Sequence, residues 1–252
     1  MTSLTLAAAQ SISLAGDLPG NIARHQAFIR AAAEQGVQLL VFPELSLTGY
    51  EPELAAGLAV QPQSSLLQPL RDLARELGVT AVVGMPIRLT AEGPLLIGAL
   101  VLAADGSLAV YSKQHLHSGE EQVFSPGVGG ASLVFAEDRV ALAVCADFSQ
   151  ASHPRAAAGS GAGIYAAGVL ISEQGYAVDS ALLQGYAVEH AMLVLMANHG
   201  GPTGGWVSAG RSAIWGPDGT LVVAAKGTGD ELLIARRTAG NWSGQQVRVQ
   251  AP

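Results

Sequence analysis

Short apolar stretches recur along the whole chain, and their length constrains the fold more than any other feature. They are rich in Val, Leu, Ile and Ala, and most are too short to form a buried helix. Runs of this kind are typical of strands in a sheet that is covered on its faces. We therefore expect strands at residues 4–9, 38–42, 79–84, 95–102, 108–112, 140–144, 168–171, 192–197 and 221–225.

Helical patterns lie between some of these strands. The clearest covers residues 21–36, where Asn21 is the expected N-cap, Phe28 and Ile29 share an apolar face, and Gly36 ends the helix. Residues 66–77 and 180–190 have a similar pattern, and Asp-Gly turns at 104–106 and 217–219 predict hairpins. Together these elements predict an α/β fold in which two sheets form an α-β-β-α sandwich with outer helices.

Composition narrows the class of protein. No linker divides the 252 residues, so we expect one domain over residues 1–252. The net charge of −7, without any basic run, argues against a nucleic-acid partner. With only 13% charged residues, a homo-oligomer is expected. Residues 1–10 lack the features of a secretory signal, and no apolar run is long enough to span a bilayer, which predicts a cytoplasmic protein without a membrane partner.

The chain has a single cysteine, Cys145. One cysteine forms no intramolecular disulfide and no Cys-rich zinc site, so Cys145 is either a small buried side chain or a reactive thiol. It follows the apolar run 140–144 and precedes small residues, an arrangement that suits a sharp turn with backbone N–H groups facing a developing oxyanion. A nucleophilic thiol in such a turn needs a base or a positive charge beside it.

Two other expected strand ends offer such groups. Pro43 ends the run 38–42 and delivers Glu44 into an apolar setting, where burial would raise the pKa of the carboxyl group toward that of a useful base. Lys113 follows the run 108–112 and offers an ammonium group. Taken alone, Glu44 is more simply explained as a surface or ion-paired glutamate, and Lys113 as a side chain that extends to solvent.

Other kinds of site have weaker support. His115 and His117 are two residues apart, but no further ligands follow at a zinc-like spacing, so we expect no metal. The Gly-rich run 159–163 lacks the full dinucleotide pattern, and we expect no cofactor. The run 206–210 lacks the first glycine of a serine-hydrolase elbow.

The order Phe-Pro-Glu44, Lys113-x-His-Leu and Cys145-x-Asp resembles the nitrilase superfamily of carbon-nitrogen hydrolases. The resemblance covers nearly the whole chain, from residues 8–10 through the segment 43–50 to Gly-Arg-Ser at 210–212 and the turn at 217–219. It implies the α-β-β-α fold and a dimer or higher homo-oligomer. It also implies a thioester mechanism, with Glu44 as general base, Lys113 as oxyanion stabiliser and Cys145 as nucleophile.

The resemblance also implies roles for residues around this triad. Glu120, four residues before Phe124, matches a second glutamate that holds the lysine and the substrate nitrogen, with Glu121 as the alternative. The oxyanion and substrate-binding part is expected to include Ala146, through its N–H, together with Asp147, Tyr50 and Asn198. Glu189 and Asn198 are expected to support the pocket.

The residues after the cysteine indicate the substrate class. Nitrile-cleaving relatives typically continue with Trp-Glu, whereas Ala146-Asp147 resembles the amidase pattern, so a small amide is the expected substrate. Many amidase-like relatives place an arginine soon after this Asp, but here Arg155 lies farther on, which puts recognition of an α-carboxylate in doubt. An N-carbamoyl compound or a nitrile with the same triad, and a catalytically silent binding protein of the same fold, stay open.

Overall fold

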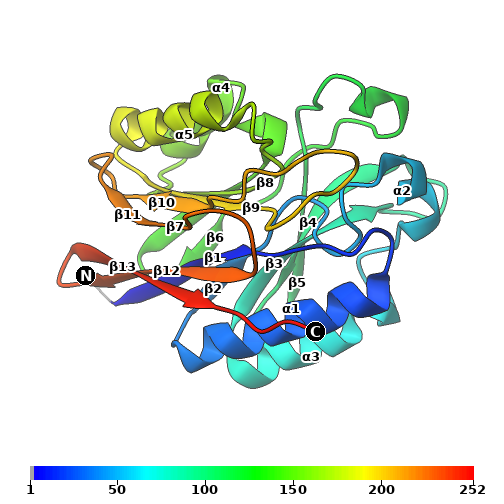
Figure 1. The fold of residues 1–252 in the computed structure, drawn as a ribbon, viewed down its shortest axis with the longest axis horizontal. Helices are drawn as coiled ribbons and strands as arrows, with labels where there is room; N and C mark the ends of the chain where they lie inside the picture. Colours follow the sequence, from blue (N-terminus) through cyan, green and yellow to red (C-terminus); the bar gives the residue numbers. More distant parts are fainter. Residues whose placement is uncertain (1–2) are drawn as a thin grey trace.

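In the computed structural model, which describes residues 3–252, two β-sheets pack face to face and helices cover both outer faces (Figure 1). The first sheet has the strand order β13-β12-β1-β2-β3-β4-β5, and the second has the order β11-β10-β9-β8-β7-β6. The two-sheet α-β-β-α sandwich expected from the sequence is therefore confirmed.

The first sheet is parallel at its centre and antiparallel on both sides. Strand β1 pairs in parallel with β2, and β2 with β3, whereas β12 and β4 join antiparallel. The strands are Leu4–Gln10 (β1), Leu39–Val41 (β2), Thr80–Ile87 (β3), Leu96–Leu102 (β4), Leu108–Ser112 (β5), Glu231–Thr238 (β12) and Asn241–Arg248 (β13).

The second sheet follows the same plan. Strands β7, β8 and β9 are parallel neighbours, and the edge strands pair antiparallel. Its strands are Leu133–Phe135 (β6), Asp138–Val144 (β7), Ile164–Val169 (β8), Leu193–Asn198 (β9), Ala213–Trp215 (β10) and Leu221–Ala224 (β11). Parallel strands place their carboxyl ends at one edge, so the loops after β7, β8 and β9 lie together.

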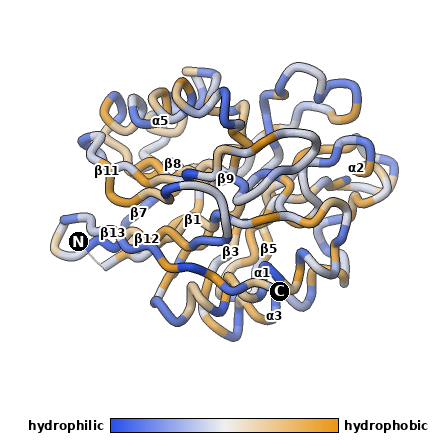
Figure 2. The backbone as a smooth tube through the Cα atoms, viewed as in Figure 1, coloured by the Kyte–Doolittle hydropathy of each residue, from blue (hydrophilic) through white to orange (hydrophobic). Residues whose placement is uncertain are grey.

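Successive side chains along the strands point to opposite faces of each sheet, and the apolar ones form three layers. In β1, Leu6 and Ala8 face the core between the sheets, while Ala7 and Ala9 face the helices. Figure 2 shows hydrophobic stretches along the central strands. One side is covered by Leu18–Glu34 (α1) and Gln68–Leu77 (α3), and the other by Ser152–Gly159 (α4) and Tyr176–His190 (α5); a short helix, Pro52–Leu58 (α2), follows the β2 loop.

The first helix begins earlier than the sequence pattern predicted. Asp17 is its N-cap and accepts a hydrogen bond from the N–H of Gly20. The expectation that Asn21 is the N-cap was wrong, because its side chain is buried and bonds instead to the backbone of Leu14 and Leu47. The helix end was predicted correctly, since Gly36 follows it with φ +66°.

Several strands were not predicted because their apolar pattern is weak or short. These are β6, β10, β12 and β13; strand β8 begins at Ile164, before the predicted 168–171 segment, and ends at Val169 within it. Strand β13 is largely polar because it lies at the sheet edge, with one face toward solvent. Among residues 3–252, no helix is long and apolar enough to cross a membrane.

Candidate active site

Three strand ends bring Glu44, Lys113 and Cys145 together, as the sequence order had suggested. Glu44 follows β2, Lys113 follows β5 of the same sheet, and Cys145 follows β7 of the facing sheet. The Lys113 ammonium lies 2.6 Å from Oε1 of Glu44, and both side chains are fully buried. The alternative in which Lys113 extends to solvent is therefore wrong. Glu44 is ion-paired, but in the interior and not on the surface.

Cys145 lies on a strained turn. Its φ of +42° is in the left-handed region, which is uncommon for a residue other than glycine and is characteristic of functional sites. The strand β7 ends at Val144, and a single 3₁₀ turn, Cys145–Asp147, follows immediately. The turn directs the thiol toward the cavity, where it donates a hydrogen bond to the carbonyl of Leu170 at 3.6 Å.

Close backbone contacts fix the Glu44 loop between the two sheets. A Cβ on Gly84 of β3 would lie 2.3 Å from the N of Leu45 and 2.5 Å from the O of Pro43. A Cβ on Gly168 of β8 would lie 2.5 Å from the O of Phe42. Only glycine therefore allows each sheet to approach the loop this closely.

Glu120 completes the buried cluster. Its Oε1 accepts hydrogen bonds from the Lys113 ammonium at 2.8 Å and the Tyr50 hydroxyl at 2.8 Å, and its Oε2 accepts one from the N–H of His117. The neighbouring Glu121 is exposed and bonds to the N–H of Gly119. The structure thus brings Glu120, and not Glu121, to the lysine.

Burial and mutual charge set the protonation of these groups. Burial raises the pKa of Glu44 to about 7, although the Lys113 charge opposes the rise. Burial would lower the pKa of Lys113, but the charges of Glu44, Cys145 and Glu120 outweigh it and hold that pKa above its usual value. Burial and then the Glu44 charge raise the pKa of the Cys145 thiol well above its usual value. The resting thiol is therefore protonated and needs a base.

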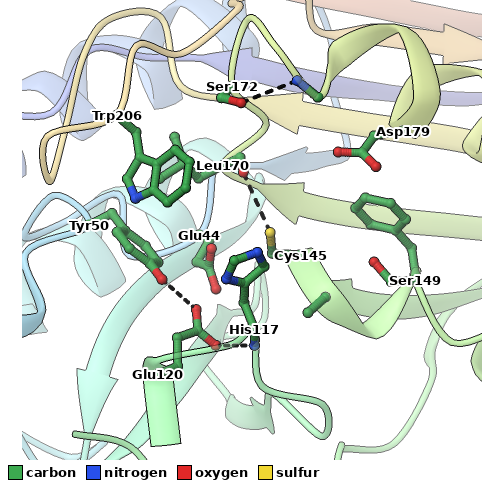
Figure 3. A pocket seen from close by; sticks show the side chains of 13 residues that line it. Glu44, Tyr50, His117, Glu120, Cys145, Ser149, Leu170, Ser172, Asp179 and Trp206 are labelled. Atoms are coloured by element: carbon green, nitrogen blue, oxygen red, sulfur yellow. Dashed lines mark hydrogen bonds between the residues drawn. The ribbon is translucent and has the colours of Figure 1, made fainter. Parts of the chain in front are cut away.

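A cavity of about 250 Å³ opens over these groups (Figure 3). Glu44, Tyr50, Glu120, Cys145 and Ala146 line it, as the sequence had placed them. Its other walls were not predicted, since they come from loops whose approach depends on the packing of the two sheets. They include His117, Phe148, Ser149, Leu170, Ser172, Asp179 and Trp206.

Two residues expected at the substrate lie behind the cavity instead. Asp147 is fully buried, and its carboxylate accepts hydrogen bonds from the N–H groups of Val144, Gln114 and His115. It thereby ties the cysteine turn to the segment after Lys113.

Asn198 likewise bonds to neighbouring backbone, at Ile171 and Gly210, and is not part of the cavity lining. Glu189, expected as a support, is exposed on α5 at a distance of 3.8 Å from His190. Within residues 3–252, no group of three His, Cys, Asp or Glu side chains is placed to hold a metal ion.

Comparison with known proteins agrees with this geometry. A model of the carbon-nitrogen hydrolase family matches residues 5–244. A nitrilase from Pyrococcus abyssi is 29% identical over 223 residues, which are 85% of this chain and 82% of that protein. A glutamine-dependent NAD(+) synthetase from Thermotoga maritima is 30% identical over 171 residues, which are 66% of this chain but only 29% of the synthetase.

A solved structure is similar over nearly the whole chain. The amidase from Nesterenkonia sp. AN1, as an alanine variant in complex with butyramide, superimposes with a TM-score of 0.84 at 29% identity, covering 94% of this chain and 92% of the amidase. Cys145 stands in the position of the catalytic cysteine of that amidase. With the family model matching almost from end to end, the chain belongs to the carbon-nitrogen hydrolase family of the nitrilase superfamily, hydrolases that act on carbon-nitrogen bonds other than peptide bonds.

Proposed function

We propose that the protein hydrolyses a small amide to a carboxylic acid and ammonia through a thioester on Cys145. The observation that carries this proposal is the placement of the Cys145 thiol on a strained turn in the same cavity as Glu44, whose partner Lys113 lies 2.6 Å away. A nucleophile, a base and a fixed positive charge are the groups that acyl transfer requires.

Acylation begins with proton transfer from the thiol to Glu44. The Oε2 atom of Glu44 has no hydrogen-bond partner among the described residues, so it is free to accept this proton. The sulfur then attacks the amide carbonyl, and the Lys113 ammonium and the N–H of Ala146 stabilise the tetrahedral oxyanion. Glu44 returns the proton to the nitrogen, which leaves as ammonia and produces the thioester.

Deacylation reuses the same base. Glu44 takes a proton from a water molecule as the water oxygen attacks the thioester carbonyl. The second tetrahedral intermediate collapses, the thiolate leaves, and the proton on Glu44 returns to the sulfur. Glu120 takes no proton in this scheme. Its Oε1 atom accepts hydrogen bonds from the Lys113 ammonium and the Tyr50 hydroxyl, and so holds the ammonium in position.

An amide is favoured over a nitrile by the residues of the cysteine turn. Ala146 lines the cavity at the position where nitrile-cleaving relatives typically have Trp. Asp147 follows it, as in the amidase pattern, and its carboxylate accepts hydrogen bonds from backbone N–H groups and from the Tyr111 hydroxyl. An N-carbamoyl compound requires the same attack on a carbonyl and is the second substrate class to screen.

Thiol labelling and ammonia release test the proposal. The resting Cys145 thiol is protonated, so rapid alkylation requires that Glu44 remove the thiol proton as the sulfur attacks. With this assistance, we expect iodoacetamide, itself a small amide, to modify Cys145 at neutral pH much faster than it modifies glutathione, and the modification to abolish ammonia release from a panel of short amides. Cys145→Ser and Glu44→Gln should each abolish turnover while the circular dichroism spectrum stays unchanged, because the two residues act as one unit. Glu189→Gln, on the exposed face of α5, is the matched control and should retain activity. Ordinary thiol kinetics, or near-normal activity of either variant, would overturn the mechanism.

A further inference from the structure

The charged side chains that line the cavity are almost all acidic. Glu44, Glu120 and Asp179 face it, and its lining contains no lysine or arginine. Lys113 lies beneath, between Glu44 and Glu120, and its ammonium bonds to both carboxylates. Among the lining residues, His117 is the side chain that can become positively charged, so a substrate carboxylate would meet negative charge without a lysine or arginine to bind it.

Asp179 differs from the other two acids because it takes no part in the buried cluster. It belongs to the first turn of α5, and no hydrogen bond or ion pair to its carboxylate is present among residues 3–252. Figure 3 shows this carboxylate on the side of the cavity away from Tyr50 and Glu120. Partial burial raises the pKa of Asp179, and the nearby His117 opposes the rise. A cation bound at this carboxylate would relieve the cost of that burial.

Aromatic side chains form much of the remaining wall. Trp206 is 44% exposed and lines the cavity together with Tyr50 and Phe148. The His117 ring contacts the Trp206 indole edge to face, with ring centroids 6.2 Å apart. A carboxylate and aromatic faces in one cavity are the combination that binds an alkylammonium group, and the chain between carbonyl and ammonium would pack on the rings.

The orientation of the substrate follows from the proposed mechanism, on which this inference rests. Glu44 returns its proton to the leaving nitrogen, so that nitrogen lies on the side of Glu44 and Glu120. The acyl chain then extends from Cys145 toward the opposite wall, where Asp179 lies. We propose that the acyl part of the substrate carries a primary ammonium group and that Asp179 is its counter-ion, so the substrate is a short ω-amino amide.

Matched amides measure this preference directly. Each ω-amino amide from 3-aminopropanamide to 6-aminohexanamide is compared with the neutral amide in which a methyl group replaces the ammonium, and succinamate supplies a negative charge. We expect kcat/KM at the best chain length to be roughly tenfold or more higher for the ammonium compound, the value of a charged hydrogen bond. Succinamate should be the poorest substrate. Asp179→Asn should remove most of the ratio of kcat/KM between the ammonium compound and its neutral match.

Binding to Cys145→Ala separates this inference from the proposed function. Titration calorimetry with each ω-amino amide and its neutral match, such as 4-aminobutanamide and pentanamide, should give the same preference without turnover, and Asp179→Asn in this background should abolish it. Glu53→Gln is the control, because Glu53 is an exposed acid in the first turn of α2 and lies outside the cavity. Equal binding of charged and neutral amides at every length, or an equal loss for all amides in Asp179→Asn, would overturn the role of Asp179. Failure of the wild-type protein to release ammonia from any amide would instead overturn the proposed hydrolysis.

Discussion

At the scale of single residues, two carboxylates share one ammonium group in a dry environment. Glu44 and Glu120 both contact the Nζ of Lys113, and all three side chains are buried. With every group ionised the cluster would carry an excess negative charge, and burial makes that excess expensive. Burial and the Glu120 charge favour the protonated form of Glu44, and its pKa rises to about 7. A general base works best at neutral pH when its pKa lies in this range.

The pH dependence of turnover follows from this shift. In the proposed mechanism Glu44 accepts the thiol proton only in its ionised form, so kcat/KM should rise with pH through an apparent pKa near 7. The value belongs to the coupled cluster of Glu44, Lys113 and Cys145 and not to one residue alone. Initial rates in overlapping buffers of constant ionic strength measure it. A profile that stays flat down to roughly pH 4 to 5, where ordinary carboxyl groups titrate, would contradict the assignment.

The neighbouring acids Glu120 and Glu121 provide a matched comparison. Glu120→Gln removes a buried counter-ion of Lys113, so we expect kcat to fall on the order of 100-fold, the cost of a few kcal/mol for disturbing a charged hydrogen bond. Glu121→Gln alters an exposed side chain and should leave kcat unchanged. Steady-state kinetics together with thermal unfolding distinguish a positioning role from loss of the fold. Equal effects of the two substitutions would refute the role given to Glu120.

At the scale of elements, the site depends on how closely strands of both sheets approach one loop. Gly84 on β3 of the first sheet and Gly168 on β8 of the second sheet both approach the backbone of segment 42–45. The sequence marks both positions only as glycines within apolar runs. The packed structure shows why glycine is required at both positions. Each glycine lies against the backbone of the loop after β2, and this loop is distant from both glycines in the sequence.

Gly84→Ala should therefore damage the site more than its size suggests. The new methyl group would displace the backbone of Pro43 and Leu45, so activity should fall sharply and stability by about 1–3 kcal/mol. Gly185→Ala is the control, because nothing lies within 4 Å of a Cβ at this exposed position in α5, and alanine should stabilise the helix by up to about 1 kcal/mol. Chemical denaturation and kcat measure both. Unchanged activity in Gly84→Ala would show that the Glu44 loop tolerates movement.

At the scale of the whole molecule, two buried histidines connect the layers around the site. His25 on α1 contacts the backbone oxygen of Asn21 at 2.7 Å and the hydroxyl of Ser46 at 2.9 Å. His199, after β9 of the second sheet, lies 2.7 Å from the carbonyl of Glu44 in the first sheet's loop. Burial lowers the pKa of His25 to about 3 and that of His199 to about 4, so both are neutral in the folded protein.

Acid should consequently destabilise the fold. The unfolded chain takes up protons at these histidines below their ordinary pKa of 6.5, whereas the folded chain does not until about pH 4 for His199. Stability is thus fully present above pH 6.5 and is lost as the pH falls, by at most about 1.4 kcal/mol per pH unit for each histidine. Glu44 acts in the opposite direction, because its raised pKa favours proton binding to the folded state.

His199→Asn isolates the histidine contribution. Its unfolding free energy, measured by urea denaturation between pH 7 and pH 4.5, should fall less steeply with decreasing pH than that of the parent protein, even if the absolute value is lower. Gln63→Ala is the control, since this exposed side chain does not titrate, and it should keep the parent slope. An identical slope in all three proteins would contradict burial of a neutral His199.

The amino-acid sequence by itself determined most of the central strands, the sandwich class and the positions of Glu44, Lys113 and Cys145 at strand ends. The apolar runs end at Ser112, at Val144 and just before Pro43, and these positions mark the ends of three strands. The end of a strand determines the position of the residues that follow it. Local pattern and residue order therefore predicted the sites of Glu44, Lys113 and Cys145. Edge strands such as β13 were missed because a half-exposed strand lacks the continuous apolar run.

Only the tertiary structure decided which residues share the cavity with the triad. It selected Glu120 over Glu121, moved Asp147 behind the cysteine turn, and brought Asp179 and Trp206 from distant segments to the cavity wall. These positions depend on contacts between loops of the two sheets, which no local periodicity encodes. The physical reason is that a strand end constrains its own next residue, whereas a cavity wall is set by how whole layers pack against each other.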